Sequence, residues 1–175
     1  MEKKLFHGFT LIELLVIMAV ISTLATVLFV IVNPAEMTRR ARDSRRISDL
    51  STIKRAIDLA IADKKVLPDT SGFINVDATS DVGNFGGSGF DLHKYLSVIP
   101  QDPKNGATGN VQVIGASCTK GSVGSDTISY KFWSDGDTYI LKSYLESLTN
   151  CETVQNDGNN NATYELGTEP GLDAI

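Results

Sequence analysis

Residues suited to catalysis or metal binding are scarce in this sequence of 175 residues. It contains two cysteines and two histidines, and neither histidine belongs to an acid–base or nucleophile pattern. So few candidate groups argue against an enzyme, and the cysteines lack zinc-ligand spacing. Two cysteines also exclude a disulfide-dense miniprotein. We therefore expect no catalytic residue and commit to no metal ligand.

Neither basic charge nor hydrophobic residues dominate the sequence as a whole. The net charge is −5 and 42% of residues are hydrophobic, values typical of one mildly acidic domain. They exclude a disordered chain and a multispan membrane protein, and they give no support to a basic nucleic-acid-binding protein. These averages conceal three unlike parts: an apolar N-terminal segment, a basic segment with net charge +4 over residues 35–66, and an acidic remainder with net charge −9.

The apolar segment covers residues 9–32 and contains a single charged residue, Glu13. A helix of this length measures roughly 36 Å, and a bilayer core is about 30 Å thick. The segment is longer than the apolar region of a secretory signal, and no small-x-small cleavage site follows it. We predict a transmembrane helix over residues 9–33 that stays in the mature protein. Asn33-Pro34 predicts a break there, because the residue before proline disfavours the α region.

Glu13 is the most informative residue of this segment. A carboxylate inside a membrane costs about 2.5–3.5 kcal/mol on insertion scales. Either it lies near one end of the span, where it is solvated or protonated, or it pairs with a cation. No cation is encoded at this depth, but cutting the chain after Gly8 would create one. The new α-amine of Phe9 would lie four residues before Glu13, one helical turn away.

The residues around Gly8 carry a resemblance to a known family. Lys3-Lys4 followed by Gly8-Phe9-Thr10-Leu11-Ile12-Glu13 resembles the class III signal of type IV prepilins and type II secretion major pseudopilins. The resemblance implies a leader at residues 1–8, cleavage between Gly8 and Phe9 by a prepilin peptidase, and N-methylation of Phe9. It also implies that Glu13, with Thr10 of the same motif, sets the register between neighbouring subunits.

Charge alone leaves the membrane orientation open, since Lys3 and Lys4 precede the span and five arginines follow it. The resemblance implies a cytosolic leader with the rest of the chain outside. One departure from the family is that Val30 stands where many members carry a helix-bending proline.

Residues 34–67 predict an amphipathic continuation of the helix, ended by Leu67-Pro68-Asp69. It contains nine basic and five acidic residues. Acidic residues are interspersed among the arginines and no aromatic accompanies them, so we expect no nucleic acid as partner. Instead we expect the arginines to face solvent, lipid phosphates or acidic neighbours. The apolar residues recur every three or four positions and predict a stripe that packs on a sheet: Ile47, Leu50, Ile53, Ile57 and Ile61.

Residues 68–153 predict a small α+β head. Three segments have strand character, 111–118, 127–134 and 138–146, and Asp135-Gly136 between the last two is a strong hairpin signal. Three antiparallel strands on the amphipathic helix give an α+β class, and the resemblance implies the type IV pilin fold. Residues 154–175 are rich in asparagine and glycine and predict a C-terminal loop or tail.

Two predictions concern specific side chains of the head. Cys118 and Cys151 form either a disulfide or two buried free thiols, and we favour the disulfide. Some pseudopilins bind calcium between loops near the last strands. The resemblance would therefore make Asp102, Asp135 and Asp137 possible calcium ligands. No EF-hand-like spacing is present and turn formation explains Asp135, so no cofactor is predicted and calcium stays a possibility.

Together these features predict a structural subunit, processed by a prepilin peptidase and assembled into a type IV pilus-like filament. The alternatives are a pseudopilin of a type II secretion system and, from another class, a single-pass membrane-anchored binding module. The expected partners are identical or related subunits, the prepilin peptidase, the inner-membrane assembly machinery and the membrane itself. We expect a precursor in the inner membrane with its head outside, and an extracellular or periplasmic filament after assembly.

Overall fold

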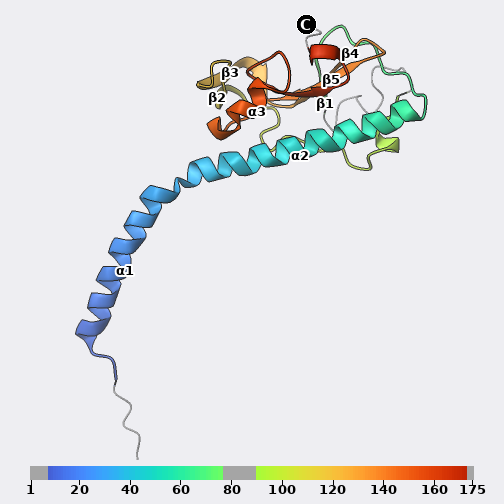
Figure 1. The fold of residues 1–175 in the computed structure, drawn as a ribbon. Helices are drawn as coiled ribbons and strands as arrows, with labels where there is room; N and C mark the ends of the chain where they lie inside the picture. Colours follow the sequence, from blue (N-terminus) through green and yellow to red (C-terminus); the bar gives the residue numbers. More distant parts are fainter. Residues whose placement is uncertain (1–7, 77–89, 173–175) are drawn as a thin grey trace, which may run out of the picture. The chain divides into compact units, whose positions relative to one another are not determined.

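The computed structural model describes residues 8–76 and 90–172 (Figure 1). Most of the predicted leader, residues 1–7, lies outside this range. The chain divides after Thr38 into two compact units, and each is described by itself.

The N-terminal unit is built on helix α1, which covers Leu11–Val32. Helix α2 follows at Pro34–Ala62, and Asn33 between them has a left-handed backbone with φ 35°. The predicted break at Asn33-Pro34 is confirmed. Pro34 occupies the first helical position of α2, where its missing N–H costs nothing, and the Asn33 side chain accepts a hydrogen bond from the Glu36 backbone N–H at 3.3 Å.

From Arg39 onward α2 belongs to the C-terminal unit, where it lies along one face of a sheet (Figure 1). The predicted apolar stripe packs there, with buried Leu50, Ile53 and Ile57, whereas Ile61 is 37% exposed. The helix also ends earlier than the predicted Leu67. Lys64 takes a left-handed conformation, φ 58°, and the Lys65 N–H closes the helix on the Ala60 carbonyl at 3.0 Å.

The main sheet has four antiparallel strands in the order β1-β4-β5-β6. The α+β class is therefore confirmed, although we predicted about three strands. The strands are β1 Ile74–Val76, β4 Tyr130–Ser134, β5 Tyr139–Ser143 and β6 Tyr164–Gly167. The central pair, β4 and β5, is the hairpin predicted from Asp135-Gly136, with Ser134 opposite Tyr139. Its fully buried side chains pack in the same core as the stripe of α2: Tyr130, Phe132, Tyr139 and Leu141.

The predicted strand 111–118 does not join this sheet. Instead β2, Thr108–Ile114, pairs with β3, Lys120–Thr127, in a separate two-stranded sheet. The cause is local: the Gly115 N–H binds the Thr119 carbonyl at 2.8 Å, which turns the chain straight back on itself. A small core of its own, Val113, Val123 and Ile128, lies beside this hairpin.

The predicted C-terminal loop is also wrong at residues 164–167, which form strand β6 along β5. The strands can pair this closely because residue 167 is glycine. An added Cβ there would lie 2.0 Å from the Tyr139 carbonyl oxygen. The remaining short helices are η2 Leu92–Lys94, η3 Leu148–Asn150, α3 Cys151–Gln155 and η4 Pro170–Leu172.

Two tyrosines fasten the sheet to α2 by hydrogen bonds. The Tyr130 hydroxyl donates to Asp49 at 2.8 Å, and the Tyr139 hydroxyl donates to Asp58 at 2.6 Å. Burial, together with these bonds to carboxylates, raises the pKa of both phenols. Asp49 and Asp58 thus link α2 to the sheet.

Candidate functional site

The predicted cleavage site lies at the start of the described chain. Gly8 and Thr10 are exposed, and the Phe9 side chain is 73% exposed. Residues 8–10 have no regular structure, and α1 begins only at Leu11. A Cβ added to Gly8 would meet nothing within 4 Å, and its φ is not left-handed. The fold therefore does not require glycine at position 8, and the Gly8–Phe9 bond lies in an accessible segment ahead of the helix.

Thr10 and Glu13 form a reciprocal cap at the N-terminus of α1. The Glu13 backbone N–H donates to the Thr10 hydroxyl at 3.3 Å. The Thr10 backbone N–H and hydroxyl both donate to the Glu13 carboxylate at 3.4 Å. The sequence Thr-Leu-Ile-Glu carries this capping-box signal, but we had linked the two residues only to contacts between subunits. Within one chain, Thr10 already satisfies part of the Glu13 carboxylate.

The rest of α1 suits an apolar environment. Leu11–Leu28 is long and apolar enough to cross a membrane, and none of it is buried. Its hydroxyl groups bond back to carbonyls of their own helix: Ser22 to Met18 at 2.7 Å, Thr23 to Val20 at 2.8 Å and Thr26 to Ser22 at 2.9 Å. This arrangement satisfies each hydroxyl without water, so the surface of the helix presents apolar groups.

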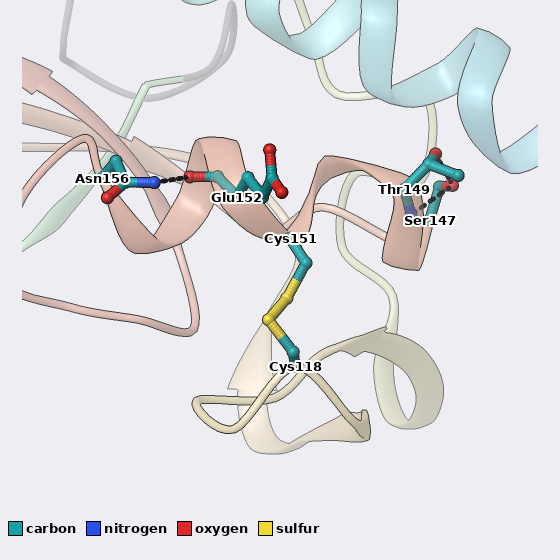
Figure 2. The surroundings of a disulfide bond; sticks show 6 residues. All are labelled: Cys118, Ser147, Thr149, Cys151, Glu152 and Asn156. Carbon is teal, nitrogen blue, oxygen red and sulfur yellow. Dashed lines mark hydrogen bonds between the residues drawn. A yellow bond between two sulfur atoms is a disulfide. The ribbon is translucent and has the colours of Figure 1, made fainter.

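The predicted disulfide is present in the C-terminal unit. Cys118, in the turn between β2 and β3, is bonded to Cys151 at the start of α3, with their Cα atoms 5.6 Å apart (Figure 2). It links the separate β2–β3 hairpin to the segment that follows β5. The turn carrying Cys118 is also held by hydrogen bonds, since the Cys118 N–H donates to the Gly115 carbonyl at 3.0 Å.

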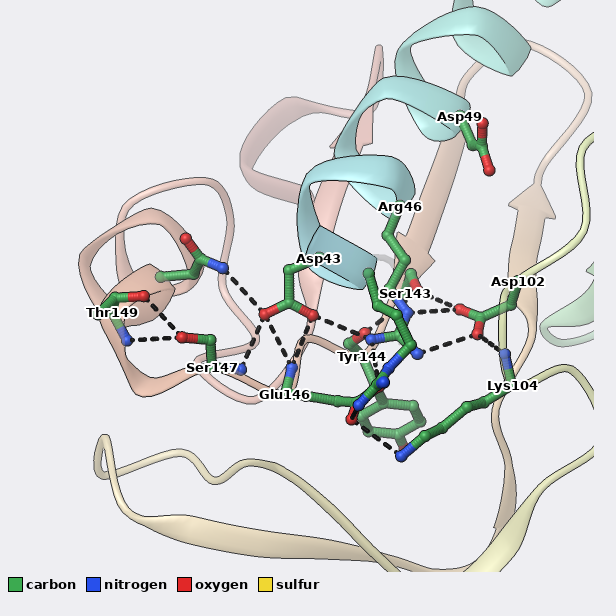
Figure 3. A network of polar contacts seen from close by, with 12 residues as sticks. Asp43, Arg46, Asp49, Asp102, Lys104, Ser143, Tyr144, Glu146, Ser147 and Thr149 are labelled. Carbon is green, nitrogen blue, oxygen red and sulfur yellow. Dashed lines mark hydrogen bonds and ion pairs between the residues drawn. The ribbon is translucent and has the colours of Figure 1, made fainter. Parts of the chain in front are cut away.

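A buried charge cluster is the feature that sequence analysis missed. Its centre is Arg46 of α2, which is fully buried and donates to Asp102 at 2.7 and 3.0 Å (Figure 3). Arg46 also donates to Asp43 at 2.9 Å and forms an ion pair with Glu146 at 2.8 Å. The two other cations of the cluster are Arg42 and Lys104, so three cations meet three carboxylates and the cluster is neutral.

Glu146 contacts all three cations of this charge cluster. It accepts from Arg42 at 2.9 and 2.5 Å and from Lys104 at 2.9 Å. Burial alone would raise the pKa of Glu146, but the bonds from Arg42 and Lys104 and the charge of Arg46 outweigh it and lower the pKa to about 2. Burial would likewise lower the pKa of Arg46, yet Asp102 and Glu146 raise it. Glu146 and Arg46 therefore stay charged at neutral pH.

The charge cluster tests two predictions, one about the arginines of α2 and one about the possible calcium ligands. Arg46 does not face solvent as expected, because it is fully buried and bonded to Asp43, Asp102 and Glu146 of its own chain. Arg42 likewise bonds to Glu146. The possible calcium ligands are not brought together either. Asp102 is committed to Arg46, whereas Asp135 caps its own turn and accepts from the Asp137 and Thr138 N–H groups at 3.0 and 2.7 Å. Over residues 8–76 and 90–172, no three His, Cys, Asp or Glu side chains are grouped so as to hold a metal ion.

Comparison with known proteins gives one match. A family model described as the prokaryotic N-terminal methylation motif matches residues 3–29. The match covers the predicted cleavage site, Thr10, Glu13 and most of α1, and it is consistent with a class III signal peptide of type IV pilin-like proteins. Curated proteins and solved structures gave no match. The motif and the apolar helix beside it suit a membrane-anchored precursor.

Proposed function

We propose that this chain is the structural subunit of a type IV pilus-like filament. A prepilin peptidase cuts the precursor between Gly8 and Phe9 and methylates the new Phe9 amine. The inner-membrane assembly machinery then adds the mature chain to a helical array of identical or related subunits. The observation that carries the proposal is the methylation motif over residues 3–29, which includes most of α1, an apolar helix whose single charge is Glu13.

The chemistry of α1 supports assembly through this helix. Lipid is as apolar as the helix surface, so close packing and polar pairs, rather than exclusion of water, drive association in the membrane. The Thr10–Glu13 contacts are long, 3.3–3.4 Å, and a cationic amine is a stronger partner for a carboxylate than a hydroxyl group. After cleavage, the Phe9 amine of a neighbouring subunit replaces the Thr10 contacts and fixes the register.

The test of this proposal is Glu13→Ala in cells that carry the assembly machinery. We expect the variant to be cleaved and methylated but to give no filaments, because each added subunit has lost the carboxylate that sets its register. Filaments are sheared from the cells and quantified by electron microscopy. The matched control is Ser22→Ala, another polar group of α1 that bonds only to its own helix, and it should assemble normally. A normal filament yield from Glu13→Ala would contradict the proposal.

Processing is tested separately with Gly8→Leu. Because open space surrounds Gly8, the substitution leaves the fold intact and acts on cleavage alone. We expect the chain to keep its leader on a denaturing gel, and mass spectrometry of the wild type to find methylated Phe9 as its first residue. A mature-sized product from Gly8→Leu, or a wild-type chain that still begins at Met1, would exclude the proposed processing.

A further inference from the structure

Residues 146–151 run from the buried charge cluster directly to the disulfide, and one carboxylate organises them. Asp43 of α2 is fully buried and accepts from the backbone N–H of Glu146 at 2.9 Å and of Ser147 at 2.8 Å. It also accepts from the Asn150 side-chain amide at 2.9 Å. The next residue is Cys151. We propose that Asp43 is the positioning residue for the Cys118–Cys151 disulfide: it holds the segment that brings Cys151 to Cys118.

Glu146, at the start of the segment, is also bound through its side chain by Arg42, Arg46 and Lys104, but residues 147–151 contain little regular structure. Between Ser147 and Cys151 lies the single turn η3, which Ser147 caps weakly by accepting from the Thr149 N–H at 3.4 Å. A single helical turn is not stable by itself. Two successive backbone N–H groups directed at one carboxylate fix both the position and the direction of the chain. Asp43 is held in turn by Arg46 at 2.9 Å, so the anchor is itself rigid.

The other cysteine is positioned from the same place. The last residue of β2, Ile114, donates its N–H to the Leu145 carbonyl at 2.8 Å. Leu145 directly precedes Glu146, whose N–H binds Asp43. The hairpin that carries Cys118 and the carboxylate of Asp43 therefore bind adjacent residues, Leu145 and Glu146. Asp43 thereby raises the effective concentration of one thiol near the other before any bond forms.

The covalent step is thiol–disulfide exchange. Both S–H bonds are lost, the S–S bond of Cys118–Cys151 forms, and two electrons and two protons pass to an external disulfide, which is reduced to two thiols. The equilibrium constant of this exchange measures how well the folded chain holds the two thiols together. The inference concerns the head alone, so its outcome is independent of filament assembly.

The test compares two asparagine substitutions on the same helix. Full-length Asp43→Asn and Asp49→Asn are equilibrated in detergent with mixtures of reduced and oxidised glutathione, and alkylation followed by mass spectrometry gives the fraction of disulfide. Asp49 is the control because it also accepts a hydrogen bond from the sheet, through Tyr130, but touches neither cysteine segment. We expect Asp43→Asn to lower the equilibrium constant about tenfold or more, since bonds to a charged acceptor are lost, and Asp49→Asn to change it less than threefold. Equal effects of the two substitutions would overturn the inference.

A second measurement needs no change at Asp43, in case that variant does not fold. In Cys118→Ser/Cys151→Ser, hydrogen exchange is followed at the N–H groups of Glu146 and Ser147. If Asp43 positions the segment, both amides stay protected to within about threefold of the wild type, because their acceptor is still present. Exchange as fast as in an unstructured peptide would show that the disulfide holds the segment, and would overturn the inference.

Discussion

Glu13 in α1 and Asp43 in α2 are both helix carboxylates, but their partners differ in kind. Glu13 is exposed, and its hydrogen bonds reach only Thr10, three residues away, at 3.3–3.4 Å. Asp43 is fully buried and binds residues 103–107 positions away at 2.8–3.1 Å. The charge cluster is satisfied within one subunit, whereas the apolar helix presents a carboxylate with weak local partners. We therefore expect polar contacts with a second subunit to stabilise Glu13 of α1 more than they stabilise the charge cluster.

The largest effect on the head is expected from Arg46→Met, which leaves Asp43 and Asp102 buried without their shared cation. Removing one partner of a buried ion pair costs about 3–5 kcal/mol, and urea unfolding of the full-length chain in detergent measures the loss. Arg45→Met is the matched control, because the Arg45 side chain is 62% exposed and surface pairs contribute about 1 kcal/mol at most. A similar loss from both variants would show that the charge cluster does not stabilise the head.

The next largest effect is expected from removing the disulfide by Cys118→Ser/Cys151→Ser. The bond closes a loop with a sequence separation of 33 residues, and a loop of this size is worth about 3–4 kcal/mol in chain entropy. Urea unfolding under oxidising conditions gives the difference between variant and wild type. Under reducing conditions the two proteins should become equally stable to within about 0.5 kcal/mol. A gap that persists after reduction would point to lost packing at these positions rather than a lost cross-link.

A smaller effect separates a partly buried hydrogen bond to a carboxylate from an exposed one. Tyr139→Phe removes the 2.6 Å bond to Asp58, and a bond to a charged acceptor contributes about 1.5–3 kcal/mol. Tyr95→Phe removes the comparable 3.1 Å bond to Asp63, which lies in an exposed setting, and should cost less than about 0.5 kcal/mol. Chemical unfolding of both variants at pH 7 makes the comparison. Equal costs would mean that burial adds nothing to the link between α2 and the sheet.

The smallest effect concerns the one buried side-chain oxygen of the described residues that lacks a hydrogen-bond partner, Oδ1 of Asp157. Burial raises the pKa of Asp157 to about 6. Because the folded state favours the protonated form, this stabilisation is complete below about pH 4, the unfolded pKa, and is lost as the pH rises through about 6. The asparagine of Asp157→Asn does not ionise, so this variant keeps its stability as the pH rises. We expect its Tm to exceed that of the wild type by about 2–4 °C at pH 8 and to match it at pH 4.

Asp135→Asn is the control for this pH dependence because its sign is opposite. Hydrogen bonds from the Thr138 and Asp137 N–H groups lower the pKa of Asp135, so its carboxylate stabilises the head above about pH 4 and that stabilisation fades in acid. The Tm of this variant should fall below the wild-type value at pH 8. Parallel Tm curves for Asp157→Asn and the wild type between pH 4 and 8 would contradict the assignment.

Features set by neighbouring residues were predictable, and features set by distant ones were not. The break at Asn33-Pro34 and the hairpin at Asp135-Gly136 follow from the backbone preferences of a few adjacent residues, and both are confirmed. The stripe of α2 is also local, because helical spacing alone places Leu50, Ile53 and Ile57 on one side. At the candidate site, the match at residues 3–29 rests on the same continuous motif that the sequence displays.

The charge cluster could not be predicted because its members are far apart in the sequence. An arginine among other charges on a helix indicates a solvated face. Only the fold shows that Arg46 binds Asp102, which lies 56 positions further along the chain. Strands β3 and β6 were missed for a different reason. Glycines and polar residues dilute their strand character, and β6 is only four residues long, so pairing with β2 and β5 decides their conformation.

The order of the partners along the chain also sets the order in which the head closes. Arg42 and Glu146 are 104 positions apart, an interval of roughly 5–20 s at ordinary rates of synthesis. During that interval the charged side chains of α2 keep the new helix hydrated, although Asp43 and Arg46 are later buried. Asp102 is made first and neutralises Arg46, and residues 146–150 reach Asp43 only near the end of synthesis. Closure of the head is therefore among the last events in the making of each subunit.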